Sequence, residues 1–497
     1  MLTPEVVHPD LSVGAVLRSR LVQPPRAAIT DRAGAPIVID RPVVTVGLQP
    51  SRVTDLPVTV ARAAELTGVD RAALLGRVTA AKPDAFVEVI TLRREAYDAK
   101  RDALRLLPGV VLREGVRQLA PTTSFARALL GKVGPATAEI VKRSAGAVRP
   151  DQVVGLSGLQ SRYDAQLGGT PGVTVEAVGP KGSPNRLVFA TPPVPGTPIQ
   201  LTLDPAVQQA ADAALLTAPA GRTAALVVVQ PSTGDVLAVA NNGPQGPGLD
   251  RALTGRYPPG STFKIASTLA LLREGLTPAQ TVACPATVTV SGKQFSNAEN
   301  EVLGAQPFRV DFANSCNTAF VGSADRITSE QLQAAARDLG YGAYDLGVGA
   351  AVADVPVTSD PVQHAAQVIG QGQVLASPLS VAVSAATVAT GRLRPPRLLM
   401  SVPATAPGPA LPQAADLRAL TRLVVTQGTA RVLASVPGAP VSGKTGTAEF
   451  GTDVPPRTHA WFTGFSGDLA FAVLVEDSGF GGVVAAPVAG ALLRGLR

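Results

Sequence analysis

The chain has 497 residues, 45% hydrophobic and 16% charged, which is long enough for two or three domains with sizeable cores and too apolar for intrinsic disorder. Its net charge is +7, but the basic residues are scattered, and neither a basic run with interleaved aromatic residues nor a zinc-ligand spacing occurs. A nucleic-acid partner is therefore disfavoured, and the mild positive balance suits work near an anionic membrane surface or cell wall. The two cysteines are too few for a disulfide scaffold, and no stretch reaches the ~18 apolar residues of a spanning helix.

The first region, residues 1–198, mixes strand-like and helical segments that are often broken by proline and glycine. Three runs have the composition of strands, namely "PVVTVGL", "AFVEVITL" and "GVVL". The composition of residues 60–81 is that of a helix. The clearest linker is "TPPVPGTP", residues 191–198. We therefore predict a domain boundary between residues 198 and 199.

The second region, residues 199–497, has strands early, helices in the middle and strands late. It opens with a short strand and a helix that starts at Asp204-Pro205, followed by a hairpin around "PSTG". Near its end, "PVSGKTGTAEF", "THAWFTGFSG" and "LAFAVLVEDS" predict three successive strands, and residues 484–496 predict an apolar helix. One antiparallel sheet that pairs both ends of the region, with helices packed on it, satisfies this order, so we predict an α+β fold.

The stretch "YPPGSTFKIAST", residues 257–268, has two interpretations. Ser261 follows two prolines and a glycine and precedes a helical apolar pattern, so it could simply cap a buried helix. On a helix, however, Lys264 lies at i+3 on the same face, so its amine could reach the Ser261 hydroxyl. The backbone N–H groups of the helix start could then hold an oxyanion. The stretch alone does not decide between a cap and a nucleophile.

Two further short motifs follow in the same region. "SCN", residues 315–317, lies 54 residues after Ser261 inside an apparently helical stretch, and "KTGT", residues 444–447, lies 183 residues after it on a predicted strand. Taken singly, the first could be a local cap and the second a surface strand with a bulge. In this order, S-x-x-K, S-x-N and K-T-G form the set of motifs typical of penicillin-binding proteins and class A β-lactamases.

Acyl transfer explains why these residue types occur together. A serine nucleophile needs a base, so Lys264 must lose its proton at neutral pH, and a second cation at Lys444 would favour that loss. Lys444 would also attract a substrate carboxylate. Ser315 could relay a proton to a leaving amine, and Asn317 could hold the substrate backbone. A strand carrying Thr447 could pair with an extended substrate and donate an N–H to the oxyanion.

The chain resembles the class B penicillin-binding proteins of high molecular mass over nearly all of its length. The resemblance is carried by "DRALTGRYPPGSTFK", "SCNTAF", "IGQGQVLASPLSVA" and "SGKTGTAE", and in the first region by "RAAITDRAGAPI" and "GLSGLQSRYDAQLGGTPG". It implies a C-terminal transpeptidase domain of the penicillin-binding and serine β-lactamase type, 199–497, and an elongated α+β pedestal or dimerisation domain, 1–198. "RAAI" departs from the family by Ala27 in place of a usual glycine.

The opening "LTPEVVHPDLSVGAVLR" resembles the segment that follows an NTF2-like domain in the penicillin-binding lipoprotein branch. That resemblance implies an N-terminally truncated form of a protein that is membrane-anchored and extracytoplasmic. The Arg- and Ala-rich composition suggests an actinobacterial source.

The resemblance also implies the site and the reaction. Ser261 would be the acyl acceptor and Lys264 its base, Ser315 and Asn317 would move a proton and bind substrate, and the Ser261 and Thr447 amides would form an oxyanion hole. The substrate carboxylate would be bound by Lys444, Thr445 and Thr447, and Gly446 would be a further substrate-binding residue. The implied function is a D,D-transpeptidase that cross-links peptidoglycan stem peptides and is acylated and inhibited by β-lactams, without a cofactor or metal. A D,D-carboxypeptidase and a non-catalytic β-lactam sensor or scaffold are the alternatives, and a peptidoglycan glycosyltransferase with division or elongation proteins are the expected partners.

Three further expectations concern single residues. His459 and Trp461 are expected to pack rather than to bind a metal, because three scattered histidines make no ligand set. Cys284 and Cys316 are as compatible with free thiols as with a bridge. Between Thr318 and Gly443 the only glutamate is Glu330, at the predicted start of a helix, so no counterpart of the deacylating glutamate of class A β-lactamases is expected.

Overall fold

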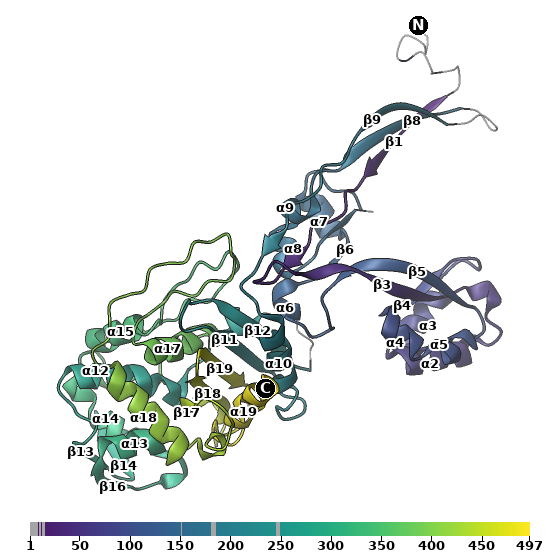
Figure 1. The fold of residues 1–497 in the computed structure, drawn as a ribbon. Coiled ribbons are helices and arrows are strands. Elements are labelled where there is room, and N and C mark those ends of the chain that lie inside the picture. The colour runs from purple at the N-terminus through teal and green to yellow at the C-terminus, as the bar shows by residue number, and fades with distance from the viewer. Residues whose placement is uncertain (1–7, 9–10, 12–14, 151, 180–184, 245–248) are drawn as a thin grey trace. The chain divides into compact units, whose positions relative to one another are not determined.

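The computed structural model describes residues 8, 11, 15–150, 152–179, 185–244 and 249–497 (Figure 1). Its backbone divides into two compact units, one of residues 1–37 and 122–497 and the other of residues 38–121. The opening segment that resembles the lipoprotein branch falls mostly outside the described residues. The two units are treated separately below.

The unit of residues 38–121 is a small sheet with helices packed against it. The long strand β3 (Pro36–Leu48) pairs antiparallel with both β4 (Val87–Arg93) and β5 (Val110–Leu119), as the strand-like runs predicted. The helical run at residues 60–81 is two helices, because Gly68 adopts a left-handed φ of 75° and Asp70 caps the second one. The helices of this unit are α2 (Leu56–Thr67), α3 (Arg71–Thr79), α4 (Arg94–Asp98) and α5 (Arg101–Arg105).

The rest of the first region belongs to the larger unit. Strand β8 (Gly172–Val178) lies between β1 (Val16–Val22) and β9 (Arg186–Thr191) in an antiparallel sheet, and β2 (Ile29–Thr30) pairs with β10 (Ile199–Gln200). The remaining elements are α6 (Arg127–Leu130), β6 (Val133–Pro135), α7 (Ala138–Arg143), β7 (Val153–Gly155), α8 (Gly158–Arg162) and α9 (Asp164–Gly168). The Tyr163 hydroxyl donates to the Gly347 carbonyl, which connects this part to the second region.

The second region is built on one five-stranded antiparallel sheet in the order β12-β11-β19-β18-β17 (Figure 1). Its strands are β11 (Ala224–Val229), β12 (Val236–Asn242), β17 (Ser442–Phe450), β18 (Arg457–Ser466) and β19 (Leu469–Val475). Helix α17 (Pro378–Thr390) covers one face, and α10 (Pro205–Leu215) with α19 (Ala485–Gly495) covers the other. The predicted pairing of early and late strands is therefore confirmed, and β17 forms one edge of the sheet.

The segment between β12 and β17 supplies α17 and a set of further helices and short strands, of which α18 packs against β17 and α11 against β12. The further helices are α11 (Arg251–Thr254), α12 (Lys264–Arg273), α13 (Phe308–Asn314), α14 (Asn317–Val321), α15 (Ser329–Asp338), α16 (Pro361–Val368) and α18 (Ala414–Thr426). Its strands are β13 (Thr281–Cys284), β14 (Thr287–Val290), β15 (Lys293–Ser296) and β16 (Gly304–Pro307), paired as β13–β16 and β14–β15. The 3-10 turns are η1 (Pro50–Arg52) in the smaller unit and η2 (Gly260–Phe263), η3 (Ala298–Asn300), η4 (Ala324–Arg326) and η5 (Arg431–Leu433) here.

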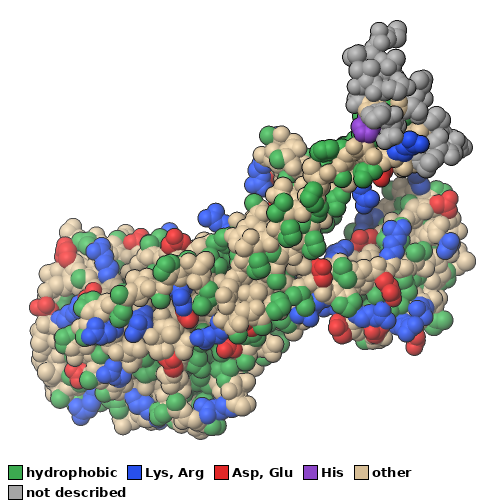
Figure 2. Space-filling view, turned by 45° about the horizontal axis from the view of Figure 1, so that its top comes forward, with side chains coloured by type: hydrophobic (Ala, Val, Ile, Leu, Met, Phe, Trp, Pro, Cys, Tyr) green, Lys and Arg blue, Asp and Glu red, His purple; other side chains and the backbone are tan. Residues whose placement is uncertain are grey.

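The surface carries charges of both signs. On the face drawn in Figure 2, basic and acidic side chains are interspersed among apolar and polar ones, in keeping with the scatter seen in the sequence. Within the part of the chain that the structure describes, every helix is too short or too polar to cross a membrane.

Candidate active site

The Ser261 turn is held against the edge strand by a glycine. Residues 260–263 form the 3-10 turn η2, which runs directly into α12. Gly260 has a φ of 51°, and a Cβ built on it would lie 2.5 Å from the Thr447 carbonyl oxygen, so only glycine permits this approach. Ser261 lies inside the turn and Pro259 is its N-cap, without any side-chain capping bond. The capping interpretation of Ser261 is therefore wrong, because its hydroxyl is not used to cap the helix.

Aromatic side chains pack around the residues just before this turn. The buried Trp461 indole donates to the Pro258 carbonyl at 3.1 Å. Tyr257 meets the Trp461 and His459 rings edge-on, and His459 stacks on Phe450 with centroids 4.0 Å apart. The expected packing roles of His459 and Trp461 are confirmed.

The S-x-N motif is a break between two helices, whereas the sequence predicted a continuous one. Ser315 ends α13 with a left-handed φ of 66°, and Asn317 begins α14. The turn is closed because the Cys316 N–H returns to the Asp311 carbonyl at 2.9 Å. Such a break depends on hydrogen bonds that cannot be predicted from the periodicity of apolar residues in the sequence. It turns the Ser315 carbonyl and the Asn317 side chain toward α12.

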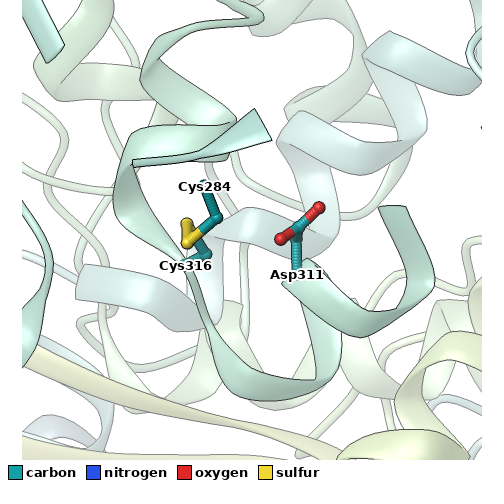
Figure 3. A group of neighbouring side chains, drawn as sticks. All are labelled: Cys284, Asp311 and Cys316. Carbon is teal, nitrogen blue, oxygen red and sulfur yellow. A yellow bond between two sulfur atoms is a disulfide. The ribbon is translucent and has the colours of Figure 1, made fainter. Parts of the chain in front are cut away.

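Cys284 and Cys316, whose state the sequence left open, form a disulfide with Cα atoms 6.3 Å apart (Figure 3). It ties β13 to the middle of the S-x-N motif. The Asp311 carboxylate lies beside it, and the three side chains bring possible ligand atoms within 4.8 Å of one another. Because the sulfurs are bonded to each other, neither is the thiolate that a metal would require.

The Lys264 amine is oriented by both halves of the S-x-N motif. Its side chain is fully buried, and Nζ donates to the Ser315 carbonyl and to Asn317 Oδ1, each at 2.7 Å, with Ser315 Oγ at 3.4 Å. The Asn317 amide in turn donates to the Ser296 carbonyl at 3.1 Å. A neutral amine has two N–H groups, which is enough for the two acceptors at 2.7 Å, and its lone pair can then accept a proton. Among the described residues no hydrogen bond joins Ser261 to Lys264, so the contact expected from i, i+3 spacing is not made in this state.

The environment of Lys264 favours that neutral form. Burial lowers the pKa of Lys264 well below its ordinary value, and the Lys444 charge lowers it further. The carboxylates of Asp311 and Glu301 act in the opposite direction and raise it. The Lys264 nitrogen also lies 5.1 Å from the centre of the Phe320 ring, on an apolar surface.

Lys444 and its neighbours belong to the edge strand β17, beside the Lys264 amine. Lys444 is fully buried, burial lowers its pKa to about 7, and its Nζ donates to the Thr445 carbonyl at 3.2 Å. The Thr445 hydroxyl is 2.6 Å from that of Thr429, and the Thr447 hydroxyl accepts from the Gly481 N–H at 3.3 Å. A Cβ on Gly446 would lie 2.9 Å from the Pro259 carbonyl, so glycine is required for the Ser261 turn to pack here.

The structure thus brings the three predicted motifs together. The residues involved are Ser261, Lys264, Ser315, Asn317, Lys444, Thr445, Gly446 and Thr447. Sequence reasoning missed three neighbours of the site, Thr429, Asp311 and Glu301. Its search for carboxylates began after the S-x-N motif, and both of these acids precede it. Asp311 could have been noticed as a lone acid between the apolar residues of a helix that ends at Ser315.

Comparison with protein families covers both regions. Residues 224–494 match the family model of the penicillin binding protein transpeptidase domain. Residues 21–201 match that of the penicillin-binding protein dimerisation domain.

Individual proteins give the same result. The chain is similar to the peptidoglycan D,D-transpeptidase PbpA of Mycobacterium tuberculosis, with 32% identity over 362 residues that cover 60% of this chain and 72% of that protein. It is also similar to the stage V sporulation protein D of Bacillus subtilis, with 27% identity over 535 residues, 95% of this chain and 78% of that protein.

Two solved structures share the fold over almost the whole chain. One is titled "Structural coordination of polymerization and crosslinking by a peptidoglycan synthase complex" and has a TM-score of 0.71 and 27% identity, covering 97% of this chain and 92% of that one. A complex of penicillin-binding protein PBP2 with MreC from Helicobacter pylori has a TM-score of 0.68 and covers 97% of this chain and 98% of that one. At 22% identity the second likeness concerns the fold alone.

Proposed function

Because this chain belongs to the class B penicillin-binding proteins, whose relatives here are peptidoglycan D,D-transpeptidases, we propose that it cross-links peptidoglycan through a serine acyl-enzyme formed on Ser261. The observation that carries the proposal is the buried Lys264 amine. It is one turn after Ser261, and its two shortest hydrogen bonds, both at 2.7 Å, need only the two N–H groups that a neutral amine has. Ser315 Oγ is a third oxygen close to it, at 3.4 Å.

Acylation would begin when the Ser261 hydroxyl loses its proton to Lys264. The serine oxygen attacks the carbonyl carbon of the penultimate D-alanine, and the N–H groups of Ser261 and Thr447 stabilise the oxyanion. The bond to the terminal D-alanine then breaks, and its amine takes a proton through the Ser315 hydroxyl. An amine of a neighbouring stem peptide next attacks the ester, releases Ser261 and completes the cross-link.

The edge strand β17 would bind the donor peptide. Among the described strands none pairs with its outer edge, so an extended chain could pair there, as in strand addition. Lys444 supplies a cation for the terminal carboxylate, with Thr445, Gly446 and Thr447 beside it, and Asn317 holds the substrate backbone. A β-lactam carries a comparable carboxylate and a reactive amide, so it would acylate the same serine.

Two other functions use the same residues. A D,D-carboxypeptidase would transfer the acyl group to water, and a β-lactam sensor or scaffold would be acylated without turning over a peptide. The dimerisation-domain match over residues 21–201 favours transpeptidation, because this domain accompanies the transpeptidase domain in class B proteins.

Intact-mass spectrometry with a penicillin, followed by peptide mapping, tests the serine mechanism. We expect one adduct per chain on Ser261 and none on a folded Ser261→Ala variant. Ser315→Ala is the matched control, because it should slow labelling without removing the nucleophile. An adduct that persists at another residue of Ser261→Ala contradicts the assignment.

Turnover of a D-alanyl-D-alanine-type thioester with and without a D-amino acid separates the three functions. A transpeptidase transfers the acyl group to the added amine, a carboxypeptidase releases mainly the acid, and a sensor shows no turnover beyond one equivalent.

The remaining assignments extend the same proposal. We place the pedestal at 1–198 and the transpeptidase domain at 199–497, with the protein membrane-anchored on the extracytoplasmic side. Its partners would be stem peptides and β-lactams, together with a peptidoglycan glycosyltransferase and the division or elongation proteins that act with it.

A further inference from the structure

Asp311 is a buried acid for which the reaction outlined above has no use. It is in the middle of α13, and its side chain has no exposed surface. Neither carboxylate oxygen has a hydrogen-bond partner among the described residues. Its neighbours in Figure 3 are the two sulfurs of the disulfide, which offer neither a proton nor a positive charge. An isolated buried carboxylate is costly, so this residue calls for a charge that balances it.

The positive charge that acts on Asp311 is Lys264 on α12. The Asp311 carbonyl closes the Ser315 turn, and the Ser315 carbonyl binds the Lys264 amine, so the acid and the amine are held by the same short loop. The charged groups that act on Lys264 are Lys444 from β17, Asp311 from α13 and Glu301 from the loop after η3. Among the described residues, Lys264 is the charged group that acts on the pKa of Asp311. The two are coupled without a direct ion pair, since no N···O contact within 4.0 Å joins them.

We propose that the Asp311 carboxylate is the counter-charge for the ammonium that Lys264 becomes when it takes the Ser261 proton, which makes Asp311 a positioning residue of acylation. The inference rests on the proposed function. The step moves one proton from the serine oxygen to the lysine nitrogen and leaves the total charge unchanged. It creates a buried cation beside a second buried lysine, where a fixed carboxylate has a larger effect than at the surface.

The direction of the effect follows from the charges. Burial raises the pKa of Asp311 to about 7, so above that pH the carboxylate is ionised when Lys264 accepts its proton. Without this negative charge the Lys264 ammonium is less stable, and the pKa of Lys264 falls further. The lysine then remains neutral to a lower pH but is a weaker base.

The experiment is the pH dependence of the second-order rate constant for acylation by a penicillin, measured on the full chain. For Asp311→Asn we expect the acidic limb to move to lower pH by about 1 unit, as for loss of one nearby opposite charge. We also expect the maximal rate to fall about tenfold, because a weaker base transfers the proton less well. Asp311→Glu keeps the charge and should restore the wild-type acidic limb.

Glu301→Gln is the matched control. It also removes a negative charge that acts on Lys264, but from an exposed loop where water and salt screen the charge, so its limb should move by less than about 0.3 unit. If Asp311→Asn does not fold, as judged by circular dichroism, Asp311→Leu replaces the isolated acid by an apolar group of similar size beside the disulfide and must show the same shift.

The outcomes separate the two ideas. If the wild-type protein forms no adduct on Ser261, the proposed function fails before any Asp311 variant is tested. If it forms the adduct and the folded Asp311 variant keeps the wild-type acidic limb, the inference is overturned, whether the maximal rate is unchanged or reduced. A reduced rate with an unmoved limb would mean that Asp311 only supports the fold of the turn.

Discussion

The unit of residues 38–121 and the surroundings of Ser261 bury different types of side chain. The smaller unit is described throughout, and its core is made of aliphatic side chains and Tyr97, with Thr59 as its only buried polar residue. The region around Ser261 buries two lysines and an aspartate completely. Burying such groups reduces the free energy of unfolding, so they are not expected in a region that only supports the fold. We infer that the unit of residues 38–121 is organised for stability and the surroundings of Ser261 for chemistry.

The largest expected effect comes from removing the buried amine. Lys264→Met should slow acylation by a penicillin by about 10³-fold or more, because the general base is lost. The free energy of unfolding should change by less than about 1 kcal/mol, since the cost of a buried amine disappears while two acceptors lose their donor. Acylation kinetics and denaturant unfolding measure both quantities. If Lys264→Met destabilised the protein as much as truncation of a buried leucine does, the proposed contrast between the Ser261 surroundings and residues 38–121 would be wrong.

The reciprocal experiment truncates the apolar core of the smaller unit. Leu74 is fully buried there, and Leu74→Ala should reduce the stability of this unit by about 3 kcal/mol through the cavity it leaves. Hydrogen exchange of peptides from residues 38–121 measures the loss, and the acylation rate should stay within about twofold of wild type. Leu106→Ala is the control, since that side chain is 82% exposed and its removal should have little effect. An acylation rate that falls with stability would show that the units are energetically coupled.

The sequence predicted the sheet well because its signals are local. The hairpin around "PSTG", the three late strands and the helix that opens at Asp204 each follow from periodicity and capping, and the pairing of early with late strands follows from their order. The three motifs predicted which residues meet, because each motif needs the others for acyl transfer.

Other features depend on contacts that the sequence does not show. The break at Ser315 is closed by the hydrogen bond from the Cys316 N–H to the Asp311 carbonyl. The apolar pattern of the sequence continues through this break and therefore predicts one uninterrupted helix. The disulfide depends on the distance between β13 and α14. Asp311 stands out in the sequence only as an acid between apolar residues, and the packing of α13 is needed to show that it is fully buried.

Removing the second buried lysine should have a smaller effect than removing the first. Lys444→Met should slow acylation by about 10²-fold, the usual consequence of losing one charged contact to the reacting group. Its pKa of about 7 adds a pH signature. The ammonium that binds a carboxylate is lost as the pH rises above about 7, so the second-order rate constant should show an alkaline limb. The first-order rate constant for acylation at saturating ligand should show its alkaline limb at higher pH, because a bound carboxylate stabilises the charged form. Identical limbs under both conditions would contradict the role of Lys444 in binding.

The smallest expected effect concerns deacylation, and it separates this protein from a β-lactamase. Glu330 is exposed in the first turn of α15, where hydrogen bonds from its own backbone N–H and from Thr328 lower its pKa. Its position is thus explained by the helix N-terminus alone. We expect a penicilloyl adduct on Ser261 with a half-life of many minutes, and Glu330→Gln should change that half-life by less than about twofold. Release of the adduct, followed by mass after rapid removal of free penicillin, gives the measurement. If the protein hydrolysed penicillin at many turnovers per second and Glu330→Gln abolished this activity, the protein would be a β-lactamase. A stable adduct in both forms would mean that Glu330 does not activate water for deacylation.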